Sequence, residues 1–186
     1  MTDEVAVLLA PGFEEIEAVT VIDVLRRAGI EVTTLAVRER EVPGAHGITV
    51  VADATLTDAG ARAFAWVVLP GGLPGATTLR DDPQVQAFVR AQHRRGGELA
   101  AICAAPIALA QADVLHGRRV TSYPGFEAQL GDVSYEASAV VDDGSVVTSR
   151  GVGTALAFAL ALVTRLRGER VAAELAARML VPRPPA

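Results

Sequence analysis

The stretch Gly97-Glu98-Leu99-Ala100-Ala101-Ile102-Cys103-Ala104-Ala105-Pro106-Ile107 decides the fold, because it joins a buried-strand pattern to the start of a helix. Residues 98–102 are short and mostly apolar, and residues 104–110 have a helical pattern with Pro106 in the first turn, where proline is tolerated. The only cysteine, Cys103, therefore follows the carboxyl end of a central strand, where open α/β sheets place ligands and nucleophiles. The alternative is a structural thiol, since free cysteine is among the most buried residue types.

Composition narrows the class of protein. A chain of 186 residues suits one domain, residues 1–186. With 51% hydrophobic but only 4% aromatic residues, the core must consist of small aliphatic side chains, as in helices packed on a parallel sheet. The net charge of −5 gives no reason to bind nucleic acid, and the apolar run 155–163 is shorter than the ~20 residues of a membrane span. A single cysteine without a signal peptide predicts a cytoplasmic protein with neither a disulfide nor a membrane partner.

Missing residue types exclude further chemistry. All 17 basic residues are arginine, and neither lysine nor asparagine occurs, so a Schiff-base lysine and a P-loop lysine are both impossible. The three histidines, His46, His93 and His116, lie far apart in the sequence. Together with the lone cysteine they leave no zinc-ligand cluster, so we expect no metal and no cofactor.

The remaining pattern predicts an α/β alternation. Strands are predicted over 4–10, 30–37, 48–52, 66–69 and 98–102, and a hairpin over 137–141 and 145–148. Helices are predicted over 14–28, 81–95, 104–110, 154–167 and 169–179, and a tail over 181–185. The hairpin turn is assigned to Asp142-Asp143-Gly144, and His46 is assigned to a loop or hairpin before residues 48–52.

Two features point to the neighbours of Cys103. Carboxylates in the first turn of helix 14–28 are favoured by the helix dipole, but Glu17 also shares a face with Val21 and Val24, so its carboxyl should be partly buried. The turn 70–75 (Pro-Gly-Gly-Leu-Pro-Gly) offers free backbone N–H groups beside the Cys103 strand. It lacks the G-x-G-x-x-G spacing of a dinucleotide site and is better interpreted as an oxyanion nest.

The chain resembles the ThiJ/PfpI family, in particular the branch of the parkinsonism-associated protein deglycase and bacterial YajL. The matching stretches are LLAPGFEEIEAVT (8–20), VVLPGGLPGA (67–76), AAICAAPIALA (100–110) and TSRGVGTALAFALALV (148–163). The resemblance implies a flavodoxin-like α/β sandwich, with helices on both faces of a mostly parallel sheet, and a homodimer. It also implies a nucleophile elbow at Cys103, a hydrogen-bonding carboxyl at Glu17, and backbone oxyanion donors at Gly72 and Ala104.

The chain also departs from the family pattern. Protease-like members have histidine after the nucleophile, whereas Ala104 follows Cys103 here, which argues against a Cys-His peptidase. Deglycase-type relatives have histidine at the position of Tyr123 and arginine at that of His46. Glu14, His46 and Tyr123 are therefore only auxiliary site residues in this prediction.

A nucleophilic Cys103 has to be ionised. Lowering a thiol pKa from 8.5 to ~5.5 requires roughly 4 kcal/mol, which a helix N-terminus and one charge-assisted hydrogen bond would together supply. An ionised Glu17 would oppose this by like-charge repulsion, so Glu17 must be protonated. A bulky side chain at Gly72, as in Gly72→Val, would then block the position of the substrate oxygen without affecting the thiolate.

Several functions fit these residues. In the enzyme hypothesis Cys103 attacks a reactive dicarbonyl such as methylglyoxal, or its early glycation adduct, in a glyoxalase III or deglycase reaction without glutathione. In the sensor hypothesis the same thiolate is oxidised to a sulfinic acid that Glu17 binds. A chaperone or interaction dimer is the third, with helix 14–28 as interface because it is apolar on more than one face. An FMN protein is disfavoured, because the carboxylates in Pro-Gly-Phe-Glu-Glu (11–15) would repel a phosphate.

Overall fold

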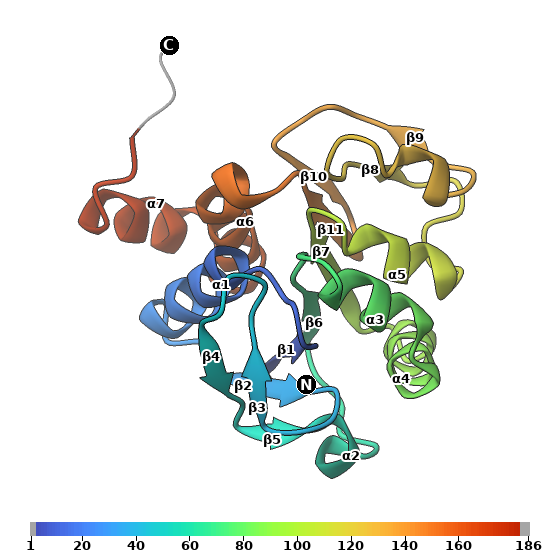
Figure 1. The fold of residues 1–186 in the computed structure, drawn as a ribbon. Coiled ribbons are helices and arrows are strands. Elements are labelled where there is room, and N and C mark those ends of the chain that lie inside the picture. The colour runs from blue at the N-terminus through green and yellow to red at the C-terminus, as the bar shows by residue number, and fades with distance from the viewer. Residues whose placement is uncertain (1–2, 183–186) are drawn as a thin grey trace.

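A seven-stranded sheet forms the middle layer of the molecule in the computed structural model, which describes residues 3–182 (Figure 1). Its strands are, in spatial order, β10 (Val140–Asp143), β11 (Val146–Ser149), β7 (Glu98–Ile102), β6 (Trp66–Leu69), β1 (Val5–Leu9), β2 (Val32–Ala36) and β5 (Ala54–Thr55). All neighbouring pairs are parallel except β10 with β11. The mostly parallel sheet expected from the sequence is confirmed.

Helices cover both faces of this sheet, which confirms the α/β sandwich. The helices are α1 (Glu15–Arg27), α2 (Leu56–Ala59), α3 (Gly75–Asp81), α4 (Pro83–Arg94), α5 (Pro106–Gln111), α6 (Ala155–Arg167) and α7 (Glu169–Arg178). Helices α1, α6 and α7 lie on one face and α3, α4 and α5 on the other (Figure 1). Because side chains alternate along a strand, Val5, Val7 and Leu9 of β1 pack toward the first group and Ala6 and Leu8 toward the second.

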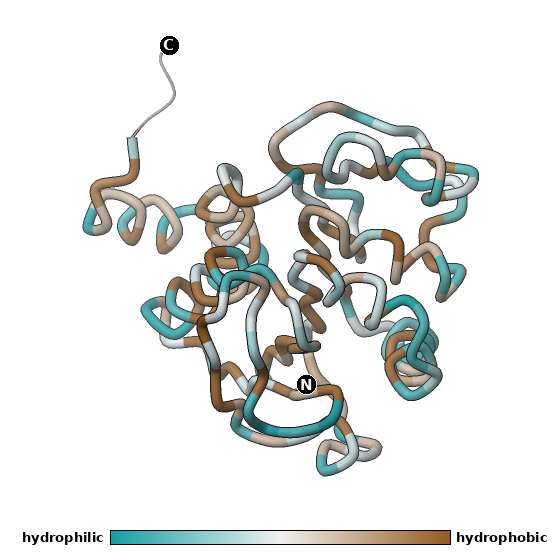
Figure 2. Tube along the Cα trace, viewed as in Figure 1, coloured by the Kyte–Doolittle hydropathy of each residue, from teal (hydrophilic) through white to brown (hydrophobic). Residues whose placement is uncertain are grey.

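The two cores are made of small aliphatic residues, as the composition predicts. Figure 2 shows hydrophobic residues along the central strands and hydrophilic residues on outward turns such as those of α4. Strand β1 is buried along its whole length, as are β6 and β11. A strand buried on both faces has a nearly continuous apolar sequence, which is why these strands were recognisable.

Several short elements lie outside the sequence prediction. Helix α3 occupies residues 75–81, directly before α4, and β5 and α2 follow Asp53.

The predicted strand 48–52 is β4 (Thr49–Val51), which pairs only with β3 (Glu41–Pro43) in a hairpin that carries His46. Strand β8 (Arg119–Val120), paired with β9 (Ser134–Tyr135), also lies outside the prediction. Strand β10 begins and ends later than predicted, so the hairpin turn lies at Gly144–Ser145.

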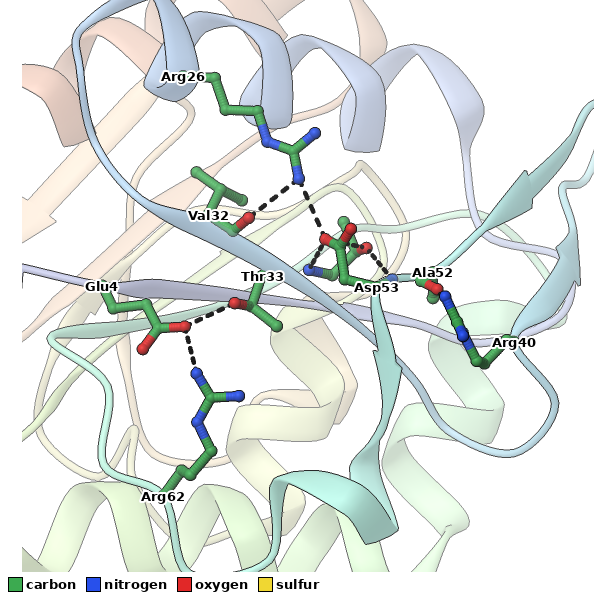
Figure 3. Close-up of polar contacts among 9 residues, drawn as sticks. Glu4, Arg26, Val32, Thr33, Arg40, Ala52, Asp53 and Arg62 are labelled. Carbon is green, nitrogen blue, oxygen red and sulfur yellow. Dashed lines mark hydrogen bonds and ion pairs between the residues drawn. The ribbon is translucent and has the colours of Figure 1, made fainter.

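Polar and charged side chains tie β2 to the segments on either side of it (Figure 3). The carboxylate of Asp53 accepts hydrogen bonds from the Thr34 N–H and hydroxyl, at 2.9 and 2.8 Å, and from Arg26 at 3.1 Å. Glu4 accepts from Thr33 and from Arg62. The Asp53 contacts hold the two-residue strand β5, which begins at the next residue, against β2. The Glu4 contacts join the start of β1 to β2 and to Arg62.

In the described part of the chain, no helix combines the length and the apolar character that crossing a membrane requires. Of the predicted tail 181–185, residues 183–185 lie outside the described residues.

Candidate active site

Four loops meet at one end of the sheet, each after the carboxyl end of a parallel strand. They follow β1, β6, β7 and β11. The Glu14 N–H donates to the Gly71 carbonyl at 2.9 Å, and the Cys103 N–H donates to the Ser149 carbonyl at 2.9 Å. These bonds join the loops pairwise around Cys103, at the edge where an open α/β sheet binds its ligands.

Cys103 occupies a strained turn. Its φ of 63° lies in the left-handed region, which costs a non-glycine residue about 1–3 kcal/mol. The surrounding structure holds it there, because its N–H bonds Ser149 and its carbonyl accepts the Tyr123 N–H at 2.8 Å. The side chain is half-buried. The sharp strand-to-helix turn predicted from the sequence is present, but helix α5 begins at Pro106 rather than at residue 104.

Glu17 is completely buried beside Cys103, with 0% of its surface exposed. Its Oε2 accepts the Gly71 N–H at 2.8 Å, and its carboxyl group lies beside the Cys103 side chain, because a Cβ on Gly71 would be 2.6 Å from the Cys103 Cβ and 2.8 Å from Glu17 Oε2. The other oxygen, Oε1, accepts no conventional hydrogen bond from the described residues. Burial, assisted by the charge of Glu14, raises the pKa of Glu17 to about 7, so its protonated form is populated at neutral pH.

The pKa of the Cys103 thiol shifts in the direction opposite to the sequence prediction. Burial, the charge of Glu17 and the hydrogen bond to Glu17 raise the pKa of Cys103 to about 12, and the N–H groups of Ala104 and Gly72 offset this only in part. The prediction relied on a helix start, but α5 has only six residues and begins three positions after the sulfur. The two groups form a coupled pair, in which a Cys103 thiolate at neutral pH requires Glu17 to keep the shared proton.

The structure brings Gly72 and Ala104 close to the sulfur, since both backbone N–H groups act on it to lower the pKa of Cys103. Gly72 has a φ of +86°, and a Cβ there would lie 2.4 Å from the Glu14 nitrogen and 2.6 Å from the Gly12 carbonyl oxygen. The expectation that Gly72→Val would affect only the substrate oxygen is therefore wrong. Any side chain at Gly72 collides with the backbone of the loop after β1.

The auxiliary residues Glu14 and His46 lie together on a second cluster. His46 Nδ1 is 3.0 Å from Glu15 Oε2 and 3.5 Å from Glu14 Oε2, and the His46 N–H donates to Glu15 Oε1 at 2.7 Å. The hydrogen bond to Glu15, with the charge of Glu14, raises the pKa of His46. Burial opposes ionisation of Glu15, but hydrogen bonds from its own backbone, His46 and Ile48 lower its pKa to about 2.

This cluster does not overturn the prediction that histidine and cysteine form no zinc-ligand cluster, because two of its three members are glutamates. One ligand atom from each of Glu14, Glu15 and His46 lies within 4.8 Å of the others. Hydrogen bonds to His46 and Ile48 already engage both oxygens of Glu15. The cluster is therefore explained as the link between the β3–β4 hairpin and α1.

Three residues of the site were not found by sequence reasoning. A Cβ on Gly71 would lie 2.6 Å from the Cys103 Cβ and 2.8 Å from Glu17 Oε2, so only glycine fits there. Gly151 lets the Tyr123 ring and the Cys103 sulfur face the same space, since its Cβ would be 3.3 Å from Tyr123 Cδ2 and 3.9 Å from Sγ. The third is Glu15, which holds His46. The glycines in the turn 70–75 and in Arg150-Gly151-Val152-Gly153 were the only available signals.

Comparison with known proteins identifies the family of the chain. Residues 3–165 match the family model described as the DJ-1/PfpI family. The chain is 41% identical over 184 residues to protein dj-1beta of Drosophila melanogaster, covering 97% of this chain and 98% of that protein. It is 35% identical over 168 residues to a Caenorhabditis elegans protein named glutathione-independent glyoxalase DJR-1.2, covering 87% and 88%.

Solved structures show the same fold. The crystal structure of Drosophila melanogaster DJ-1beta superposes with a TM-score of 0.94 at 41% identity, covering 98% of this chain and all of the other. Toxoplasma gondii DJ-1, in an oxidized form, superposes with a TM-score of 0.93 at 34% identity, covering 97% and 99%. The flavodoxin-like architecture, the elbow at Cys103 and the extent of these matches together establish that the chain belongs to the DJ-1/PfpI family.

Proposed function

We propose that the chain is a cysteine-dependent, glutathione-independent enzyme that converts reactive 1,2-dicarbonyls, or their early glycation adducts, to 2-hydroxy acids. The observation that carries the proposal is the contact between Cys103 and the fully buried Glu17, whose raised pKa makes it a proton donor and acceptor near neutral pH. The C. elegans relative with the name of a glyoxalase supports the same reaction class.

The first step is addition of sulfur to the aldehyde. The Cys103 thiolate forms a bond to the aldehyde carbon, and the C=O π pair moves to the oxygen, which takes the proton of Glu17. The N–H groups of Gly72 and Ala104 act on the sulfur in the free enzyme, where they lower the pKa of Cys103. Once sulfur is alkylated and neutral, these donors are released to the alkoxide that forms beside it.

The second step transfers a proton, and the third adds water. The Glu17 carboxylate removes the hydrogen of the former aldehyde carbon as a proton and returns it to the former ketone carbon, while the proton of the new hydroxyl group moves to the former ketone oxygen. The product is the thioester of a 2-hydroxy acid. Water then gives one proton to the Glu17 carboxylate and attacks the thioester carbon, the C–S bond breaks, and the thiolate and protonated Glu17 are restored. The sum is dicarbonyl plus water to 2-hydroxy acid, so no external oxidant or reductant is required.

Lactate formation from methylglyoxal in glutathione-free buffer tests the proposal. We expect turnover by the native chain, its loss in Cys103→Ser, and a large loss of kcat in Glu17→Gln, which keeps the shape of Glu17 but cannot carry the proton. Equal lactate formation by the native protein and Cys103→Ser, or none by either, would refute the enzyme assignment.

A sensor role is the second candidate, because Cys103 is half-buried rather than sealed and a relative has been crystallised in an oxidized form. In this role peroxide would oxidise the thiolate to a sulfinate hydrogen-bonded to protonated Glu17. Mass spectrometry of peroxide-treated protein distinguishes the two roles. A sensor gains two oxygens on its single cysteine at peroxide levels far below those that oxidise free thiol, and shows no lactate formation.

We further propose a cytoplasmic homodimer that associates through α1 and the β3–β4 hairpin. Ile16 and Val19 of α1 are exposed, as are Ile48 and Val51 of the hairpin, and Val19 and Val51 line the same surface pocket. Exposed apolar side chains gathered in this way are typical of interaction sites.

A further inference from the structure

The Tyr123 ring stands beside the nucleophile. Its backbone N–H bonds the Cys103 carbonyl at 2.8 Å, and its Cδ2 is separated from the sulfur only by the space over Gly151, which has no side chain. The ring is held by an edge-to-face contact with Phe126, with centroids 6.5 Å apart and planes at 74°. Tyr123 is nevertheless 51% exposed, so one part of the ring is available to a ligand.

Two further apolar residues directly follow glycines that lie near the thiol. Leu73, 54% exposed, follows Gly72, whose N–H lowers the pKa of Cys103. Val152, 40% exposed, follows Gly151, where an added Cβ would lie 3.3 Å from Tyr123 Cδ2 and 3.9 Å from the sulfur. Large exposed apolar side chains cost free energy in water unless something covers them. Here all three follow or contact residues that touch Cys103.

We propose that Tyr123, Leu73 and Val152 form a surface that binds an aryl substituent of the substrate, so that aromatic 1,2-dicarbonyls are preferred to methylglyoxal. The proposal rests on the proposed function and names its substrate class. When sulfur bonds the aldehyde carbon, a substituent on the adjacent ketone extends away from the Gly72 and Ala104 donors, toward the Tyr123 ring. A ring–ring contact of this kind gives a preference of roughly three- to tenfold, and covering Leu73 and Val152 adds to it.

Kinetics with two substrates test the proposal. The ratio of kcat/KM for phenylglyoxal to that for methylglyoxal is measured in the native chain, in Tyr123→Phe and in Tyr123→Ala, as mandelate and lactate formed. Comparing one ratio between variants cancels the intrinsic reactivities of the two compounds. We expect the ratio to fall roughly tenfold in Tyr123→Ala and to stay unchanged in Tyr123→Phe, which keeps the ring. An equal ratio in all three proteins would overturn the proposal.

Gly151→Ala probes the same space from the opposite side. The φ of Gly151 is 161°, an extended conformation that alanine adopts without strain, and the added methyl would meet Tyr123 Cδ2 at 3.3 Å. We expect the phenylglyoxal rate to fall more than the methylglyoxal rate. A parallel fall in both would count against an aryl site at this position.

Alkylation of Cys103 separates this proposal from the enzyme assignment. The reagents are 2-bromoacetophenone and bromoacetone, in which sulfur displaces bromide from the CH2 carbon and the neighbouring carbonyl carbon carries an aryl or a methyl group. The single cysteine makes the product unambiguous. If no dicarbonyl is turned over but the aryl preference in alkylation still falls in Tyr123→Ala and not in Tyr123→Phe, the aryl surface stands and the proposed function fails. If the alkylation preference is the same in all variants, the aryl surface is refuted whatever the turnover.

Discussion

Replacing Glu17 with glutamine should flatten the pH dependence of stability. The pKa of Glu17 is about 7 in the folded chain and 4.5 for an unperturbed glutamate. Because the folded value is the higher one, the stabilising contribution is complete below pH 4.5 and is lost as the pH rises through 7. The two values differ by about 2.5, and at about 1.36 kcal/mol per pKa unit the native chain should lose about 3 kcal/mol of unfolding free energy over this range.

The glutamine variant carries no charge at any pH in this range, and its amide oxygen still accepts the Gly71 N–H. Urea denaturation of both proteins between pH 4.5 and 8 measures the effect. The unfolding free energy of Glu17→Gln minus that of the native chain should grow by about 3 kcal/mol with rising pH, since groups such as His46 are common to both and cancel. Glu17→Leu should show the same pH trend from a lower baseline, because it leaves the Gly71 N–H without its acceptor. A difference that stays constant with pH would show that Glu17 is ionised throughout and would refute the reasoning.

Three further outcomes are expected. The ultraviolet absorbance of the Cys103 thiolate should reach its full value at a lower pH in Glu17→Gln than in the native chain, because a neutral amide does not repel the sulfur. Identical titrations of the two proteins would show that Glu17 does not affect the pKa of Cys103. Ile16→Arg should convert a dimer to a monomer in light scattering at micromolar concentration with unchanged circular dichroism, and a native chain that is already monomeric would refute the proposed interface. The His46 imidazole should titrate above 6.5 by NMR, and its midpoint should fall in Glu15→Gln, which carries no charge; an unmoved midpoint would mean that Glu15 does not hold the imidazolium.

Sequence alone located the elements whose pattern is long or fully apolar. Residues 66–69 and 98–102 are strands with the predicted bounds, since each is an apolar run next to glycine or proline. Helix α3 was missed because seven residues beginning Gly75-Ala76-Thr77 have weak helical propensity and merge with the turn before them. Strand β10 was misplaced because its second half is Asp142-Asp143, which is polar at an exposed edge and looks like a turn.

The features of the candidate site also divide into those that the sequence predicts and those that depend on contacts between distant residues. Burial of Glu17 followed from its helical spacing relative to Val21 and Val24, so it could be predicted. The requirement for glycine at 71 and the tight contact at Gly151 could not, because both arise from contacts with residues far away in the sequence. The direction of the Cys103 pKa shift was also beyond the sequence, since it depends on the balance between one buried carboxyl group and two backbone N–H groups.

The two outer strands of the sheet bear on how copies of this chain meet. An open strand edge invites a strand from another molecule and is a common origin of aggregation. One edge here is β5, only two residues long, and the other is β10, which carries Asp142 and Asp143 and whose Asp143 carbonyl is occupied by the Arg118 guanidinium at 3.1 Å. Neither edge offers a long row of free backbone groups for continuing the sheet into a neighbour. Copies of the chain are therefore not expected to add strands to one another's sheets as in a fibre. Association through side-chain surfaces instead can stop at a symmetric dimer.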